Sequence, residues 1–162
     1  MSDRLLNKNI FSFSPNEIKF KERPLFVEAN LRLDWRACFT IFLIDSLSGR
    51  TAPSIKKLSF YNWFLLSSER FELLKQAFSE NGGLIAASIK HDPNLTRILS
   101  YLIGLGLLEH KKSKYALTTT GQLVANQILV ENDLFMSEKK ILDEVQSKKT
   151  TEKFINELFG SN

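Results

Sequence analysis

The chain has 162 residues, of which 43% are hydrophobic and 25% are charged, and these proportions are near those of globular proteins, so a disordered chain is not the expectation. The net charge is +4, with +6 on residues 1–130 and −2 on residues 131–162, which allows phosphate contacts without requiring them. The sequence shows no signal peptide and no apolar run long enough to cross a membrane, so we expect a cytoplasmic protein without a membrane partner.

The first half of the chain is predicted to be helical. A strongly apolar helix begins at Asp34, a good N-cap, and ends before Gly49. Two further helices follow, the first capped by Ser54 and the second beginning near Ser68.

The second half has the pattern of a winged helix. Residues 84–89 predict a strand, and Asp92 with Pro93 begins a helix that ends at Gly106. The buried stripe of that helix is predicted to contain Leu95, Ile98, Leu99, Leu102 and Ile103. Strands over 107–110 and 115–118 then form a hairpin, and Thr119 or Thr120 caps the next helix. In a winged helix, the helix before the hairpin is the candidate recognition element and the hairpin is the wing.

The expected fold class is therefore mainly α with a small β hairpin. The sequence predicts four parts: a polar lead-in over residues 1–32, helices over 33–83 that pack on a winged helix, the winged helix over 84–131, and short helices over 132–162.

Five side chains are candidates for DNA contact. They are Arg97 on the predicted recognition helix and His110, Lys111, Lys112 and Lys114 at the hairpin tip. Lysines of a wing contact phosphates without reading sequence, and base readout needs polar side chains along the recognition helix. The predicted helix offers only one arginine. Three interpretations stay open: a tip that is simply solvated, weak contact with DNA phosphates that reads no sequence, and specific readout of a DNA sequence.

Two apolar sets are candidates for a partner interface. The first, in the segment "LSFYNWFLL", consists of Phe60, Trp63 and Phe64, which either fill the core or anchor a partner. The second lies on a short C-terminal helix and consists of Phe154, Ile155, Leu158 and Phe159. Because so short a helix is marginal in water without contacts, it must dock on its own domain or on a partner, and we expect the partner.

Catalysis has little support in the sequence. His91 and His110 have no partners spaced as in a metal site or a catalytic triad, and no phosphate-binding loop is present. The single cysteine, Cys38, is expected to be a buried structural thiol. We therefore expect a protein that is not an enzyme and that uses no metal or cofactor.

Two segments resemble a known family. The segment "LSFYNWFLLSSERFELL" is similar to the Leu-x-x-Leu-Asn-Trp-type helix and the Ser-Arg-containing helix of middle components of ABC-three-component systems. Residues 84–128 resemble the same proteins' strand, Asp-Pro-capped helix, Gly-Leu-Leu hairpin and Leu-Thr-x-x-Gly helix start. The resemblance covers residues 33–128, with Lys90 and His91 where the family prefers Arg-Tyr before Asp-Pro.

The resemblance implies a small non-catalytic adaptor encoded beside an SMC-like ABC ATPase and an effector, often a nuclease, as in Lamassu-type anti-phage defence systems. The adaptor would bridge the ATPase and the effector, with DNA contacted weakly through the complex. The alternative is a winged-helix transcriptional regulator that reads an operator with Arg97 and the wing.

Overall fold

The computed structural model describes residues 32–49, 51–79, 92–131 and 133–146, together with Lys153 and Ile155. These residues are mainly helical with one small antiparallel hairpin, which confirms the predicted fold class. The elements are α1 (Leu33–Leu47), α2 (Ile55–Leu65), α3 (Ser68–Ser79), α4 (Pro93–Gly104), β1 (Leu108–Lys111), β2 (Lys114–Leu117), α5 (Thr119–Val130) and α6 (Met136–Gln146).

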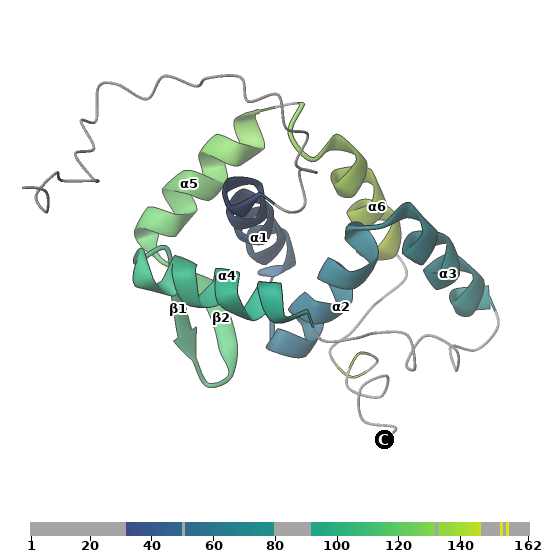
Figure 1. Ribbon diagram of the computed structural model, residues 1–162, viewed down its shortest axis with the longest axis horizontal. Coiled ribbons are helices and arrows are strands. Elements are labelled where there is room, and N and C mark those ends of the chain that lie inside the picture. Colours follow the sequence, from purple (N-terminus) through teal and green to yellow (C-terminus); the bar gives the residue numbers. More distant parts are fainter. Residues whose placement is uncertain are drawn as a thin grey trace, which may run out of the picture.

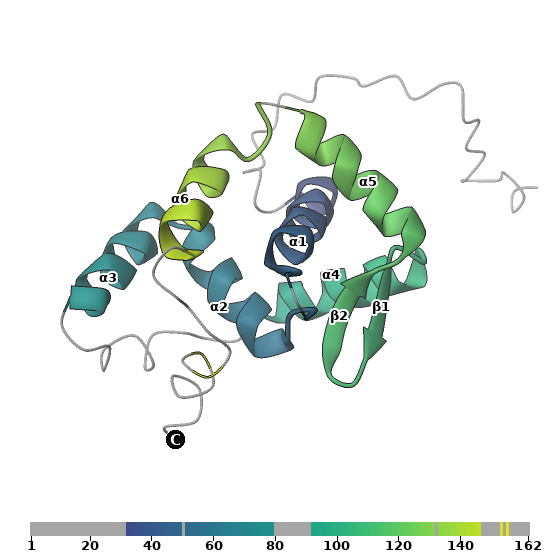
Figure 2. The same ribbon diagram turned by 180° about the vertical axis from the view of Figure 1, so that it is seen from behind.

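Helix α1 lies at the centre, and α2, α4 and α5 surround it (Figure 1). Seen from behind, the β1–β2 hairpin and α3 stand at opposite ends of the molecule (Figure 2). Because α1 carries no charge from Ala37 to Ile44, it can be buried on most sides. One hydrophobic cluster joins side chains from α1 through α6, so the two predicted parts over residues 33–83 and 84–131 share a single core.

The aromatic side chains of α2 belong to this core. Phe60 and Phe64 are fully buried, and Trp63 is 7% exposed, so none of the three offers a surface to a partner. The Phe60 and Phe64 rings lie 5.3 Å apart in an edge-to-face arrangement. The interface interpretation of Phe60, Trp63 and Phe64 is therefore wrong. Its physical reason is that α2 is covered by other helices, so every residue from Leu58 to Leu65 is buried.

The C-terminal prediction is corrected at the one member of its stripe that the structure describes. Ile155 is fully buried and belongs to the hydrophobic core of its own chain, so it is not free to anchor a partner. Phe154, Leu158 and Phe159 lie outside the described residues.

The hairpin forms as predicted, but each strand is shifted by one residue. Leu108 pairs with Leu117 and Lys111 with Lys114, which leaves only Lys112 and Ser113 in the turn. Both turn residues have positive φ angles, of 50° and 61°, as in the turns that match the twist of a two-residue hairpin.

The hairpin also has a neighbour in the segment before α2. Ser54 forms an isolated antiparallel bridge with Lys114, and the N–H of Tyr115 donates to the carbonyl of Pro53 (3.0 Å). This segment therefore extends the hairpin on its outer edge. The strand predicted over residues 84–89 lies outside the described residues.

Helix α4 has well-formed ends. At its start, Asp92 is the N-cap and accepts a hydrogen bond from the N–H of Asn94 (2.9 Å), with Pro93 following, as predicted. At its end, the N–H groups of Gly106 and Leu107 donate to the carbonyls of Ile103 and Leu102, which is a Schellman motif with Gly106 at a φ of 71°. Ile103 was expected in the buried stripe, but it is 38% exposed, so the stripe ends at Leu102.

Two helix starts differ from the predicted caps. The N-cap of α1 is Arg32 rather than Asp34, and the Asp34 carboxylate instead pairs with the Arg32 guanidinium at 2.9 Å. The N-cap of α5 is Thr118, whose Oγ1 accepts from the N–H of Gly121 (3.1 Å). Thr118 Oγ1 also donates to the carbonyl of Gly106 at 2.7 Å, which ties the start of α5 to the end of α4.

Candidate interaction surfaces

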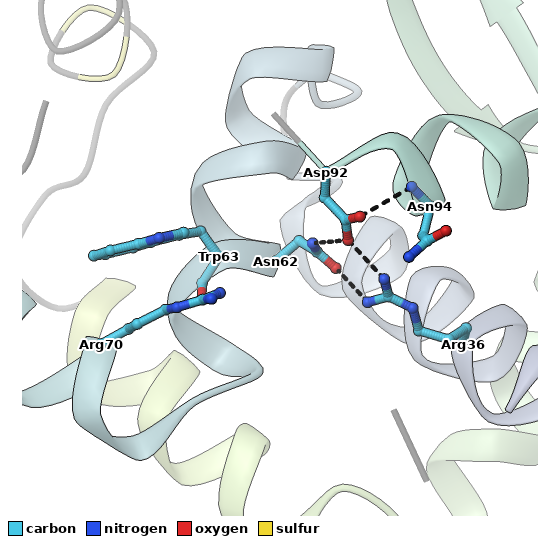
Figure 3. A network of polar contacts seen from close by, with 6 residues as sticks. All are labelled: Arg36, Asn62, Trp63, Arg70, Asp92 and Asn94. Carbon is cyan, nitrogen blue, oxygen red and sulfur yellow. Dashed lines mark hydrogen bonds and ion pairs between the residues drawn. The ribbon is translucent and has the colours of Figure 1, made fainter. Parts of the chain in front are cut away.

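A buried polar network fixes the start of α4, the predicted recognition helix (Figure 3). The Arg36 guanidinium, from α1, lies 2.6 Å from a carboxylate oxygen of Asp92. The amide of Asn62, from α2, donates to the same oxygen (3.2 Å), and its own oxygen accepts from Arg36 at 3.5 Å. Three helices are thereby joined at one carboxylate, which also caps α4. The network therefore sets the direction in which α4 presents its outer face.

The electrostatics of this network favour the ionised carboxylate. Partial burial by itself raises the pKa of Asp92, but the hydrogen bond from Arg36 acts against it, together with the Asn94 N–H, the Arg36 charge and the Asn62 amide. The net result is a pKa below the ordinary value of an aspartate. Asp92 is thus a charged anchor for Arg36 at neutral pH.

The outer face of α4 changes character along its length. From its start to Ser100 it exposes polar side chains, including Asn94, Arg97 and Ser100. After Ser100 it exposes Tyr101 at 45%, and the C-cap residue Leu105 is 53% exposed. Arg97 is the one cationic side chain on α4. A face this poor in hydrogen-bonding groups beyond its first turns is ill suited to reading base edges.

The apolar half of this face borders a groove between α1, α4 and α5. The groove has a volume of about 470 Å³, and its lining is apolar apart from Asp34. The side chains that define it are Leu33, Cys38, Ile41, Tyr101, Leu105 and Val124. Leu33, Tyr101 and Leu105 are each about half exposed, so the groove opens onto the surface. Exposed apolar surface gathered in one place is typical of a binding site.

Cys38, which was expected to be buried, is only partly buried and contributes to this groove as an apolar side chain. Burial, followed by the nearby charge of Asp34, raises the pKa of the Cys38 thiol above its ordinary value. A neutral thiol is a poor nucleophile and a poor metal ligand, so the groove is suited to binding an apolar group and not to chemistry on the sulfur.

The basic hairpin tip carries fewer free cations than its sequence suggests. The Lys111 ammonium lies 2.6 Å from the Glu109 carboxylate, which offsets its charge. His110 stacks on Tyr115 with the ring centroids 4.4 Å apart. Lys112 and Lys114 have no acidic partner within the described part of the chain, and Lys112 stands in the turn itself. Four of the five predicted DNA-contact residues therefore lie on the hairpin, as expected. The fifth, Arg97, lies on α4.

The groove is the feature that sequence patterns missed. Leu33 of α1 is far in the sequence from Tyr101 and Leu105 of α4, and each alone is an ordinary apolar residue. The only local signal was on α4, where Tyr101 and Leu105 extend the apolar pattern beyond the stripe that one buried face needs.

Comparison of the chain with family models, with curated proteins and with solved structures gives no match. Within the described ranges, no group of three or more His, Cys, Asp or Glu side chains is placed to hold a metal ion. Of the helices that the structure describes, none is both long and apolar enough to cross a membrane.

The tip lysines lead to the first prediction. Replacing Lys112 and Lys114 with glutamate should weaken DNA association of the chain and of any complex that contains it. The slope of log affinity against log salt should fall by about 2, because each lost phosphate contact contributes about 0.9 to that slope. Fluorescence anisotropy with a short duplex at several salt concentrations measures the slope.

A matched charge control for this prediction comes from two lysines on α6, Lys139 and Lys140. The Lys139→Glu, Lys140→Glu variant has the same net charge and should change the slope much less. Equal loss in both variants would show that overall charge, and not the hairpin tip, governs the association.

Proposed function

We propose that the chain is a cytoplasmic, non-catalytic adaptor that binds an SMC-like ABC ATPase and holds an effector subunit, with DNA contacted weakly through the complex. Two lines of support lead there. The first is the resemblance of residues 33–128 to middle components of ABC-three-component systems. The second is the surface of the winged helix itself, which offers more to an apolar protein segment than to base edges.

The observation that carries the proposal is the groove beside α4. A sequence-specific DNA-binding protein carries hydrogen-bonding side chains on the outer face of its recognition helix. On α4 this face instead carries Tyr101 and Leu105, which line the groove together with Leu33 of α1. The Arg36–Asp92 pair joins the start of α4 to α1, so the two helices that supply Tyr101, Leu105 and Leu33 are tied to each other in the free chain. Preorganised apolar pockets lower the entropy lost on binding and are where interface hot spots concentrate.

The second prediction tests the groove. Leu105→Glu should place a charge at its mouth and abolish co-purification of the tagged chain with the co-expressed ATPase. A buried, unpaired carboxylate at the centre of an interface typically costs several kcal/mol, which is a loss of affinity of at least about a hundredfold. Because Leu105 is half exposed in the free chain, the substitution should leave the thermal unfolding temperature nearly unchanged.

Leu73→Glu is the matched control for this test, because Leu73 is exposed to a similar degree but lies on α3, away from the groove. It should retain the ATPase. If Leu105→Glu also retained the ATPase, the groove would not be the docking surface and the proposal would lose its structural support.

One observation favours the second candidate, a DNA-binding transcriptional regulator. Lys112 stands in the hairpin turn, and Lys114 is close to it, as a wing that contacts phosphates requires. A regulator would bind one duplex sequence much more tightly than others, by a factor of about a thousand or more. Selection of bound sequences from a random duplex pool separates the two candidates, because the adaptor should enrich no sequence.

A further inference from the structure

Two lysine-bearing parts of the chain meet beside the hairpin. The strand β2 lies next to the segment before α2, because Ser54 pairs with Lys114 in an antiparallel bridge. Ser54 is the N-cap of α2, so Lys56 follows within the first turn of that helix. Given the spacing of paired residues and of two residues along a chain, the Cα atoms of Lys56 and Lys114 lie within roughly 12 Å of each other. The first turn of α2 and the hairpin therefore share one surface.

Both parts carry lysines where the local backbone disfavours them. Lys56 and Lys57 stand in the first turn of α2, which contains no acidic residue, although the N-terminal end of a helix is partly positive and favours acidic side chains. Lys112 has a φ of 50° in the hairpin turn, a conformation that glycine and asparagine adopt more easily. Because residues that break a local rule are expected at functional sites, these positions indicate a function that needs the positive charge.

The surface around these lysines suits phosphate groups better than it suits a protein. Of the large apolar side chains that the structure describes as exposed, none belongs to residues 51–57 or 111–117. The exposed residues there include Thr51, Lys56, Lys112 and Ser113. Lysines and hydroxyl groups contact the phosphate oxygens of DNA, whereas the centre of a protein interface is enriched in aromatic and other apolar side chains. Within the described ranges, Lys56 has no acidic partner, like Lys112 and Lys114.

We propose that Lys56, Lys112 and Lys114 form one basic strip that binds the phosphate backbone of duplex DNA. A duplex carries one negative charge for about every 1.7 Å of its axis, so the hairpin turn and the first turn of α2 can contact phosphates of the same duplex. Helix α2 thereby joins a DNA-binding surface that the sequence assigned to α4 and the hairpin. The proposal rests on the DNA contact within the proposed function, and it does not require the groove to bind the ATPase.

The full chain, without a protein partner, tests the basic strip. Lys56→Gln removes one charge without adding an opposite one, and it should lower the slope of log affinity for a short duplex against log salt by about 0.9. Changing Lys112 and Lys114 to glutamine as well should lower that slope by about 2.7, because three phosphate contacts are then lost. Fluorescence anisotropy at several salt concentrations measures each slope. Since Lys56 is exposed and opposes the helix dipole, Lys56→Gln should not lower the melting temperature.

Lys140→Gln is the matched control for this test. It removes the same charge from an exposed position on α6, which stands away from the hairpin (Figure 2), and it should leave the slope close to that of the wild type. A second measurement locates the contact. In a Cys38→Ser background, a photoactivated cross-linker attached through Lys56→Cys should join the chain to the duplex, whereas the same reagent attached through Lys140→Cys should not.

Equal slopes for Lys56→Gln and the wild type, or equal cross-linking from the two positions, would overturn the proposal. A chain that binds no duplex even at low salt would overturn it too. If poly-glutamate displaced the labelled duplex as well as unlabelled duplex does, the basic strip would belong to an acidic protein and not to DNA. None of these outcomes bears on the Leu105→Glu test, so a failure of the strip is distinguishable from a failure of the adaptor proposal.

Discussion

Gly121→Ala should destabilise the protein by about 3 kcal/mol or more, because there is no room for a Cβ where α5 meets the start of the hairpin. A Cβ at this position would overlap the carbonyl oxygen of Leu107 and lie 3.3 Å from Leu117 Cδ2. The carbonyl cannot move away cheaply, since it accepts a hydrogen bond from the N–H of Thr118 at 3.0 Å. In a domain of this size the loss corresponds to a fall in melting temperature of roughly 10 °C.

Gly104→Ala is the control for this prediction. Gly104 lies in the last turn of α4, and a Cβ there would meet nothing within 4 Å. Alanine at an open helical position should stabilise by up to about 1 kcal/mol. Urea unfolding of both variants measures the difference. A Gly121→Ala protein as stable as the wild type would mean that α5 and the hairpin are not in the described contact.

The second large effect is expected at the polar network. Asp92→Ala should cost about 3 kcal/mol, because it leaves the Arg36 guanidinium buried without its partner and removes the N-cap of α4. The Arg36 side chain is only 10% exposed, so its guanidinium stays largely buried after the carboxylate is lost. Asp92→Asn keeps a capping oxygen and should cost less than the alanine change.

A double-mutant cycle separates charge from capping. Arg36→Met fills the buried space of the arginine with an apolar side chain. In that background Asp92→Asn should lower the free energy of unfolding much less than it does in the wild type. If the losses of unfolding free energy were additive in the cycle, the two side chains would act independently. That result would contradict a direct contact of 2.6 Å between them.

The same pair gives a stability change at acid pH. The pKa of Asp92 is depressed in the folded protein, so its contribution is fully present above the ordinary aspartate pKa and is lost as pH falls from that value toward the folded pKa. The wild type should therefore lose stability over this interval more steeply than Asp92→Asn. The two proteins are compared by their unfolding midpoints at successive pH values below 5, because carboxylates with a pKa of about 4 titrate in this range.

Local sequence signals were sufficient to predict helix starts where a capping residue is present. Ser54, and Asp92 with Pro93, predicted two helix starts because a capping side chain acts on N–H groups within three residues of it. The hairpin was placed one residue off, since its turn consists of Lys112 and Ser113 and lacks the glycine or asparagine that usually marks positive φ.

Signals that depend on three-dimensional proximity were not available from the sequence. Phe60 and Phe64 could be assigned to the core only once α2 was seen to be covered on all sides. The Arg36–Asp92 pair joins residues 56 positions apart, and the groove needs α1, α4 and α5 in one place. The network leaves no periodic pattern in the chain, and the groove leaves only the extra apolar residues Tyr101 and Leu105 on α4, so neither was predicted.

Hydrogen exchange of the chain alone and in complex with the co-expressed SMC-like ATPase tests the adaptor proposal most directly. The account predicts added protection in peptides covering Leu33–Ile41 and Arg97–Leu107, which line the groove, with little change in the turn at Lys112 and Ser113. Protection confined to the hairpin turn, or no stable complex with the ATPase, would contradict it.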